Sequence, residues 1–411
     1  MKLDIVIPAY NEEAGIGQIV ERCLAARDTI VRDTPVTMVT VTVVSDGSGD
    51  STAERARAFE PEVKVIAYQP NRGYGAALST GFAAGDGELV AFLDADGTCD
   101  PLFFAPLVDA LLRHSASVAI GARLGAGTRM PPIRRLGNRL WRFLVNWIAG
   151  TRITDAASGM RVVRREALPL LQPLPEGMHF TPTMSCRAAL DARLSIVEVP
   201  MTYEERIGTS KLSVVVDGLR FLKAIIDVGL TYQPFRLLSV PGFLLLVVAA
   251  ALLAPCALRY LTERVVREGD IYRLLTVLVL GTVGLQLFLA GLVAERAVEM
   301  VHPKKWHGGT LLQWLNRIVT GPHLLTAGAL LIATALAINA GGLYTYVTAG
   351  FVWQHWSRAA IGGLLVLLGF QCLAASILDR VFSLLRGSAA ELATRSSAIP
   401  GSGASPDRIR A

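Results

Sequence analysis

The sequence predicts an α/β domain with a mostly parallel sheet and helices on both faces, followed by an all-α membrane domain of four transmembrane helices. Short β-branched runs alternate with helical patterns over about the first 125 residues. Charged residues then disappear in long blocks after residue 235. Apolar residues make up 52% of the chain and charged residues only 18%, below the roughly 25% of an average soluble protein. This balance excludes a wholly soluble chain and a disordered one.

The expected strands are short, apolar and bounded by turn-forming residues, at 3–7, 36–44, 63–67, 89–93 and 117–121. The expected helices lie between them, at 14–26, 52–59, 76–84 and 101–113. Continuous apolar strands that alternate with helices indicate a parallel sheet covered on both faces. Ligands bind such sheets beyond the carboxyl ends of the strands. The polar segments 8–13, 45–50 and 94–97 fall at those ends.

Two carboxylates, Asp94 and Asp96, directly follow the expected strand 89–93 and emerge on the same side of it. Neighbouring carboxylates repel each other unless a cation lies beside them. A hard divalent ion, Mg²⁺ or Mn²⁺, accepts a few protein oxygens and completes its shell with water and phosphate oxygens. Such an ion suits a diphosphate leaving group. The alternative is a pair of solvated loop aspartates, and the convergence of three polar loops weakens it.

The segment 45–50 begins where the second strand ends. Asp46 can accept hydrogen bonds from a base or a ribose, and the glycines beside it allow close backbone approach. The alternative is a turn in which Asp50 or Ser51 caps the next helix, and both interpretations can hold at once. The segment 73–75 resembles the start of a dinucleotide fingerprint but lacks its third glycine and follows the third strand. A nicotinamide-dependent oxidoreductase is therefore excluded.

Four segments are long and apolar enough to cross a bilayer, at about 237–258, 274–294, 324–347 and 359–380. An even number of spans places both ends of the chain on one side of the membrane. The loop between the second and third spans is basic, which favours a cytosolic location for it. The loop 259–273 carries four arginines as well, so charge alone does not fix the orientation. We expect the N-terminal domain and the C-terminus to be cytoplasmic.

The regions beside the membrane domain carry their own patterns. Residues 210–235 are expected to form an amphipathic interface helix, and 137–149 combine tryptophan with arginine as interfacial helices do. The alternative for both is an ordinary helix that faces the core. The tail 386–411 consists of small and polar residues, which predicts disorder.

The net charge of +6 with a pI near 9.2 suits contact with anionic lipid better than nucleic-acid binding. Five scattered cysteines without a CxxC pair argue against disulfides and a zinc site.

An ordered series of motifs, IVIPAYNEE, VVSDGSGDST, NRGYGAALSTGF, FLDADGTCDP, DAASGMRVVRR and ERIGTSKL, resembles family 2 inverting glycosyltransferases of the GT-A fold. Within that family it is most similar to the dolichyl- and polyprenyl-phosphate mannosyl- and glucosyltransferases. The resemblance covers residues 3 to about 225. Together with the apolar and amphipathic segments, it predicts a GT-A domain over 1–209, an interface helix over 210–235 and a membrane domain over 236–385. It also implies transfer of a hexose from a nucleotide diphosphate sugar to a polyprenyl phosphate.

The resemblance carries site roles to matching positions of this chain. The residues expected around the nucleotide sugar are Pro8, Tyr10, Glu12, Asp46, Asn71, Gly73, Asp94, Ala95, Asp96 and Ser210. The expected catalytic residues are Asp94, Asp96, Arg206 and Lys211, where Arg206, Ser210 and Lys211 belong to a loop that closes over the diphosphate. Asp96 and Asp94 would bind Mg²⁺ or Mn²⁺, with Asp96 the favoured direct ligand. Arg123 and Arg134 or Arg135 would meet the phosphate of the lipid.

Two departures from the family pattern affect the site. The family usually has two aspartates where this chain has Ser45 and Asp46, so one nucleotide contact is lost or supplied by serine. It often has leucine and glutamine where this chain has Gly97 and Thr98, so a glutamine ligand to the metal is missing. The composition of the coordination shell therefore stays open.

The chemistry of the acceptor is consistent with this set of residues. A phosphate monoester has a second pKa near ~6 and is largely dianionic at cytosolic pH, so it attacks without a general base. The enzyme then needs cations for the acceptor, and the arginines that follow residue 120 supply them. Asp155 is expected to orient one of these arginines or the acceptor.

Two other functions are alternatives to this transfer reaction. One is a membrane polysaccharide synthase, whose Gln-x-x-Arg-Trp motif is not found, and the other is a non-catalytic scaffold or lipid transporter. The sequence leaves the base, the sugar and the oligomeric state open.

Overall fold

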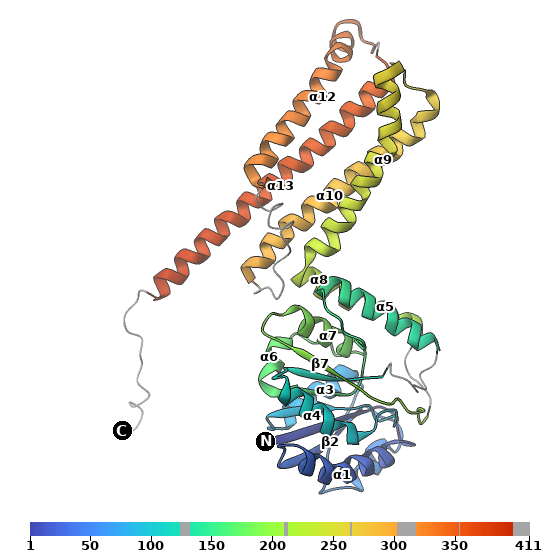
Figure 1. The fold of residues 1–411 in the computed structure, drawn as a ribbon, viewed down its shortest axis with the longest axis vertical. Helices are drawn as coiled ribbons and strands as arrows, with labels where there is room; N and C mark the ends of the chain where they lie inside the picture. Colours follow the sequence, from blue (N-terminus) through green and yellow to red (C-terminus); the bar gives the residue numbers. More distant parts are fainter. Residues whose placement is uncertain (124–131, 209–212, 264, 302–317, 353, 398–411) are drawn as a thin grey trace. The chain divides into compact units, whose positions relative to one another are not determined.

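The computed structural model describes the 411 residues except 124–131, 209–212, 264, 302–317, 353 and 398–411. The chain divides into two compact units, the first comprising Met1–Gln233 and the second beginning at Pro234 (Figure 1). The first unit carries the sheet, and the second is entirely helical in its described part. Each unit is described by itself.

The first unit is built on a seven-stranded mixed sheet with the order β3-β2-β1-β4-β6-β5-β7. Its strands are β1 Lys2–Ala9, β2 Met38–Asp46, β3 Lys64–Tyr68, β4 Leu89–Phe92, β5 Val118–Ala122, β6 Arg161–Arg164 and β7 Ile196–Pro200. All neighbours pair in parallel except β6, which is antiparallel to both β4 and β5. The predicted fold class, a mostly parallel sheet within an α/β domain, is confirmed.

Helices cover both faces of this sheet, as the continuous apolar strands predict. The helices of the unit are α1 Ile16–Asp33, α2 Thr52–Arg57, α3 Tyr74–Ala84, α4 Phe104–Arg113, α5 Pro132–Ala149, α6 Leu168–Leu171, α7 Phe180–Leu190 and α8 Val214–Tyr232. Along β1, Ile5 and Ile7 pack with α1 and α4, whereas Val6 packs with α3 and α7 on the other face. This alternation buries both sides of every central strand.

The five predicted strands correspond to β1–β5, and the sequence reasoning missed β6 and β7. Each is only four or five residues long. β6 contains Arg161, which is fully buried, and charged residues are depleted in strands. Its strand conformation depends on pairing with β4 and β5, so no local pattern predicts it.

The second unit contains, within the described residues, four helices long and apolar enough to cross a bilayer. They are α9 Val240–Glu263, α10 Ile271–Val301, α12 Gly321–Ala349 and α13 Trp356–Ser397 (Figure 1). A short π-helix, Phe235–Ser239, leads into α9, and a 3₁₀ turn, Glu268–Asp270, leads into α10. The four candidate spans have mean hydropathies of 2.6, 2.3, 1.8 and 2.2. Because α13 continues to Ser397, the helix extends into the stretch for which disorder was expected from 386; residues 398–411 lie outside the described part.

Small residues allow these helices to pack closely. The backbones of α9 and α10 approach each other at Gly242 and Gly284. A Cβ added to Gly242 would lie 2.7 Å from the carbonyl oxygen of Gly284. Gly328 of α12 meets Gly369 of α13 in the same way. Contacts of this kind are typical of helix pairs in membranes, where close approach replaces the hydrophobic driving force available in water.

Candidate active site

The loops after β1 and β2 form one hydrogen-bonded layer at the carboxyl edge of the sheet. The register pairs Ala9 with Ser45, so the two strands end side by side. The amide of Asn11 donates to the hydroxyl of Ser48 (3.1 Å), and the amide of Glu12 donates to the hydroxyl of Thr52 (2.8 Å). The predicted meeting of these loops at one edge is therefore present.

Asp46 is buried and organises the loop between β3 and α3. Its carboxylate accepts the amides of Arg72 and Gly73, both at 2.7 Å, and the side-chain amide of Asn71 at 3.1 Å. Gly47 has φ +67°, and an added Cβ would overlap Asn71, so only glycine fits there. Three of the predicted nucleotide-binding residues, Asp46, Asn71 and Gly73, thus lie in one bonded cluster. Their contact with a nucleotide stays a prediction.

Asp96, at the end of the β4 segment, is the centre of the predicted acidic site. Its Oδ1 accepts the amide (3.1 Å) and the hydroxyl (2.6 Å) of Thr98, while its Oδ2 accepts Arg206 Nη1 at 2.8 Å. The other nitrogen of the same guanidinium, Nη2, donates to Glu12 Oε1 at 2.7 Å. Arg206 therefore bridges two carboxylates from different loops. Thr98, one of the departures from the family pattern, orients the aspartate.

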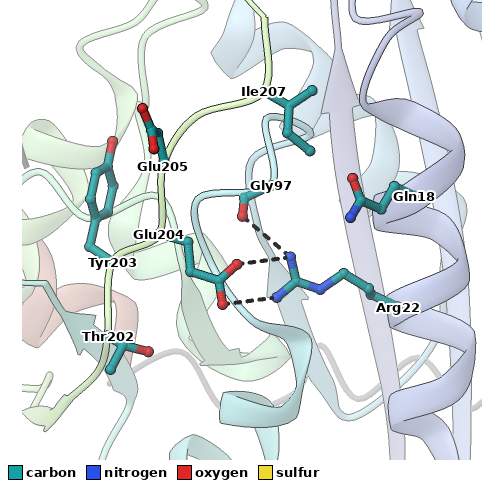
Figure 2. A pocket seen from close by; sticks show the side chains of 8 residues that line it. All are labelled: Gln18, Arg22, Gly97, Thr202, Tyr203, Glu204, Glu205 and Ile207. Atoms are coloured by element: carbon teal, nitrogen blue, oxygen red, sulfur yellow. Dashed lines mark hydrogen bonds and ion pairs between the residues drawn. The ribbon is translucent and has the colours of Figure 1, made fainter. Parts of the chain in front are cut away.

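Arg206 is placed by residues 201–208, which we call the strap. The amide of Glu204 donates to the carbonyl of Thr98, and the amide of Ile207 donates to the carbonyl of Asp96, both at 2.9 Å. Figure 2 shows Arg22 of α1 reaching the Glu204 carboxylate and the carbonyl of Gly97, each at 3.3 Å. Backbone hydrogen bonds thus join the strap directly to the loop that carries Asp96. The side chain of Arg22 adds a second connection between the strap and that loop.

Asp94 faces different partners from Asp96. Its Oδ1 accepts the hydroxyl of Tyr74 at 2.8 Å, and its other oxygen lies against Gly159, where a Cβ would overlap it. The Tyr74 ring packs edge-on against Phe180. Burial raises the pKa of Asp94 to about 6, and the charge of Asp96 adds to this rise, while the hydrogen bond from Tyr74 opposes it. The two aspartates therefore have separate environments.

Arg123, predicted to meet the acceptor phosphate, is held by Asp155. Its Nε and Nη2 donate to the two oxygens of Asp155 at 2.7 and 3.0 Å, and its guanidinium lies 5.7 Å from the Tyr203 ring centroid. Asn138 of α5 also donates to Asp155, at 2.8 Å. Burial raises the pKa of Asp155, but the adjacent Arg123 outweighs it and holds that pKa below its ordinary value. The expectation that Asp155 orients an arginine agrees with this geometry.

The remaining predicted residues are distributed around this centre. Tyr10 is exposed just beyond β1, next to the buried Pro8, and Ala95 is buried between the aspartates. Arg134 and Arg135 belong to the start of α5. Ser210 and Lys211 lie outside the described residues.

The sequence reasoning missed three residues of this region, namely Tyr74, Arg22 and Arg161. Tyr74 stands between two glycines at the start of α3, which is the one local signal for it. Arg161 is fully buried and donates to the carbonyls of Ser158 and Ala156, both at 3.0 Å. Burial lowers the pKa of Arg161 to about 10. Nothing in the motif series distinguishes Arg161 or Arg22 from a surface arginine.

We expect Tyr74→Phe to reduce kcat/KM for the sugar donor roughly 10- to 100-fold, because a hydrogen bond to a charged group contributes about 1.5–3 kcal/mol. Binding of the bare nucleoside diphosphate should not change. The bond lowers the pKa of Asp94, so its removal should move the acidic limb of the pH–rate profile to higher pH. Steady-state kinetics between pH 5 and 8 test this, with ~0.5-unit steps.

The matched control is Tyr272→Phe, since Tyr272 of α10 is 82% exposed and belongs to the helical unit. This variant should retain the wild-type profile. An unchanged acidic limb in Tyr74→Phe would show that the phenol does not act on Asp94.

Residues 4–170 match the family described as Glycosyl transferase family 2. The chain is 30% identical over 357 residues to the low-salt glycan biosynthesis hexosyltransferase of Haloferax volcanii, which covers 85% of this chain and 81% of that protein. That match is longer than the whole first unit, so it includes part of the helical one.

Two further relatives match over a shorter stretch. The dolichyl-phosphate hexose transferase of Haloferax volcanii is 33% identical over 56% of this chain and 94% of its own length. An undecaprenyl-phosphate 4-deoxy-4-formamido-L-arabinose transferase of Pectobacterium atrosepticum is 30% identical over 58% of this chain and 71% of its own length. Among solved structures, glucosyl-3-phosphoglycerate synthase of Mycobacterium tuberculosis, crystallised with Mn²⁺ and uridine diphosphate, is 22% identical over 55% of this chain and 79% of its own, with a TM-score of 0.45.

Proposed function

Because this chain belongs to glycosyl transferase family 2, and is thus a glycosyltransferase, we propose that it moves a hexose from a nucleotide diphosphate sugar to a polyprenyl phosphate, with inversion at the anomeric carbon. The observation that carries the proposal is the bridge from Arg206 to Asp96 and Glu12, at the carboxyl edge of the sheet. The helical unit of the same chain makes it a membrane protein. Relatives named for dolichyl- and undecaprenyl-phosphate support the lipid acceptor.

The donor would lie along the loops after β1, β2 and β4. Tyr10 is exposed and offers its ring to a base, while Asp46 holds the loop 71–73 that forms the opposite side. Asp94, fixed by Tyr74, would receive hydroxyls of the sugar. Arg206 would meet the diphosphate, since guanidinium groups bind phosphate oxygens by paired hydrogen bonds.

The residues at this edge fit a divalent metal ion. Asp96 and Glu12 present hard oxygen donors that one guanidinium already bridges, so the site accommodates positive charge. Within the described residues no three His, Cys, Asp or Glu side chains gather as a metal site. Few protein ligands would then be supplied, and we propose that Asp96, with Asp94 beside it in the sequence, would hold Mg²⁺ or Mn²⁺ while phosphate oxygens and water complete the shell. When bound, the ion would neutralise charge on the leaving diphosphate.

The acceptor phosphate would be held by Arg123. Asp155 uses the Nε and Nη2 side of the guanidinium, and arginine carries further N–H groups on Nη1. A fixed guanidinium places its charge without a loss of rotamer entropy on binding. Since the phosphate is already an anionic nucleophile, no residue of the chain has to remove a proton from it. Arg134 or Arg135 would add charge from the start of α5.

Two contacting helices of the first unit offer a surface for the bilayer. Trp141 of α5 packs against Phe221 of α8, with ring centroids 6.2 Å apart. Large apolar side chains nevertheless stay exposed on both helices, at Leu136, Leu140 and Phe143 of α5 and at Val215, Val216 and Leu219 of α8. Exposed apolar stripes on adjacent helices indicate an interaction site. We propose that this surface lies against the lipid, with the first unit on the cytoplasmic side.

Replacing Leu136 and Leu140 by aspartate is expected to raise the KM for a long-chain polyprenyl phosphate about tenfold, because two charges would be pressed against lipid. The kcat/KM for a short-chain, water-soluble acceptor phosphate should stay at its wild-type value. Assays of full-length protein in nanodiscs measure both. The paired control is Val31→Asp with Met38→Asp, two exposed apolar residues on α1 and at the start of β2. Equal effects in both double variants would contradict the surface.

The activity itself is tested with the purified full chain, radiolabelled nucleotide sugars, Mn²⁺ and undecaprenyl or dolichyl phosphate. Label that enters the lipid phase and is released by mild acid supports the proposal. Label in an insoluble polymer would indicate a polysaccharide synthase, and no transfer with any donor would indicate a non-catalytic protein. Protease accessibility of the first unit in sealed vesicles of known orientation tests the cytoplasmic location.

A further inference from the structure

A pocket lies at the C-terminal end of α5, and neither Asp94 nor Asp96 is among its lining residues. It has a volume of about 550 Å³ and is lined by Arg142, Phe143, Asn146, Trp147, Arg152, Ile153 and Thr154. The residues predicted to meet the acceptor phosphate, Arg134 and Arg135, belong to the first turn of α5. At ~1.5 Å per residue, about 10 Å of helix separates Arg135 from Arg142, the first pocket residue on α5. None of the residues assigned to the transfer reaction lines this pocket.

The two arginines of this pocket have no hydrogen bond or ion pair within the described part of the chain, and most other described arginines of the first unit have one. Their helix adds to the positive charge, because α5 contains four arginines and no acidic residue. Glu198 contacts the pocket-lining Thr154, accepting the amides of Thr154 and Asp155 at 2.8–2.9 Å and the Thr154 hydroxyl at 3.0 Å. Glu198 forms no ion pair with Arg142 or Arg152 within the described residues, so both guanidinium groups keep their donors for a ligand.

The backbone around the pocket is fixed in place. Asn146 of α5 accepts the amide of Ile153 and donates to its carbonyl, both at 2.8 Å, and it also accepts the Thr151 hydroxyl at 3.1 Å. Gly150, with φ +67°, turns the chain back at the end of the helix. These bonds fix the backbone on both sides of Arg152, and Arg152 lines the same pocket as Arg142. The backbone that carries the two arginines is therefore ordered before any ligand binds.

We propose that this pocket, the Arg142–Arg152 pocket, binds the phosphate of an anionic phospholipid headgroup at the bilayer surface. Paired guanidinium groups suit a phosphate oxyanion. A lipid is favoured over free phosphate because Trp147 and the exposed Phe143 line the same pocket, and Trp is enriched where headgroup and acyl chain meet. The exposed Leu136 and Leu140 continue the apolar stripe along α5. The site would anchor the first unit on anionic membrane, separately from the acceptor.

The test uses the full chain, purified in detergent and delipidated, with native mass spectrometry as the readout. The probes are phosphatidylglycerol, phosphatidylcholine with the same acyl chains, and sn-glycerol phosphate. The wild type should retain one phosphatidylglycerol with at least tenfold preference over phosphatidylcholine. The double variant Arg142→Gln, Arg152→Gln should lose that preference at least tenfold. The double variant Arg57→Gln, Arg113→Gln, with the same loss of charge on exposed positions of α2 and α4, should keep it.

Equal loss in the two double variants would overturn the proposal, since net charge alone would then explain retention. Binding of sn-glycerol phosphate as strong as that of phosphatidylglycerol would overturn the lipid source. Thermal unfolding of both variants verifies that they fold, and Arg142→Lys, Arg152→Lys should recover part of the preference. Sugar transfer in detergent to a short-chain acceptor is measured in the same samples. Its absence in the wild type would remove the proposed function and leave the headgroup site standing.

Discussion

Asp96→Asn is expected to lower the rate of sugar transfer by about three orders of magnitude while the protein stays folded. The change removes one negative charge from the site that would meet the metal ion, and electrostatic terms of this kind contribute several kcal/mol to catalysis. Asparagine keeps an oxygen for the amide and hydroxyl of Thr98, so the loop retains its local bonds. Initial rates at saturating donor and Mn²⁺ measure the loss.

A matched control separates this effect from a general loss of negative charge. Asp109→Asn changes a carboxylate on α4 whose partner in the described structure is the exposed Arg113, and it should retain wild-type activity and Mn²⁺ affinity. Electron paramagnetic resonance of Mn²⁺ should show weaker binding only in Asp96→Asn. Full metal-dependent transfer by Asp96→Asn would remove the basis of the proposed mechanism.

The sequence was sufficient to predict the strands and loops that have a local pattern. Asp94 and Asp96 follow an apolar run, and β-strand periodicity with the α/β connection rule places them at the carboxyl edge of the sheet. The four candidate membrane helices follow equally from length and apolar composition. In each case residues near one another in the chain determine the outcome.

The parts that could not be predicted depend on partners distant in the chain. Asp46 binds Arg72 and Gly73 across 26 and 27 positions, and Arg206 reaches Glu12 across 194. The pairing of Arg123 with Asp155 was expected only as one of two possibilities, because nothing local selects the arginine. β6 is the clearest failure: its strand pairs in the direction opposite to its neighbours, and its buried Arg161 contradicts the local preference for apolar residues.

Arg206→Met is expected to act in opposite directions on metal binding and on turnover. Arg206 occupies oxygens of Asp96 and Glu12 that would otherwise be available to a cation. Its removal should therefore raise the affinity for Mn²⁺ severalfold when no nucleotide is present. The same change should lower kcat by about two to three orders of magnitude, since a positive group beside the leaving diphosphate would be lost.

Calorimetric titration of Mn²⁺ and steady-state kinetics on the same preparation distinguish these two effects of Arg206. Arg206→Lys should restore part of kcat, because it returns the charge without the paired geometry of a guanidinium. Arg32→Met, an exposed arginine paired with its neighbour Asp33, should change neither quantity. If Mn²⁺ affinity instead falls in Arg206→Met, the guanidinium orders the carboxylates for the metal rather than competing with it. The strap would then keep the same position when the donor binds, and Arg206 would stay bonded to Asp96 and Glu12 in the donor-bound enzyme.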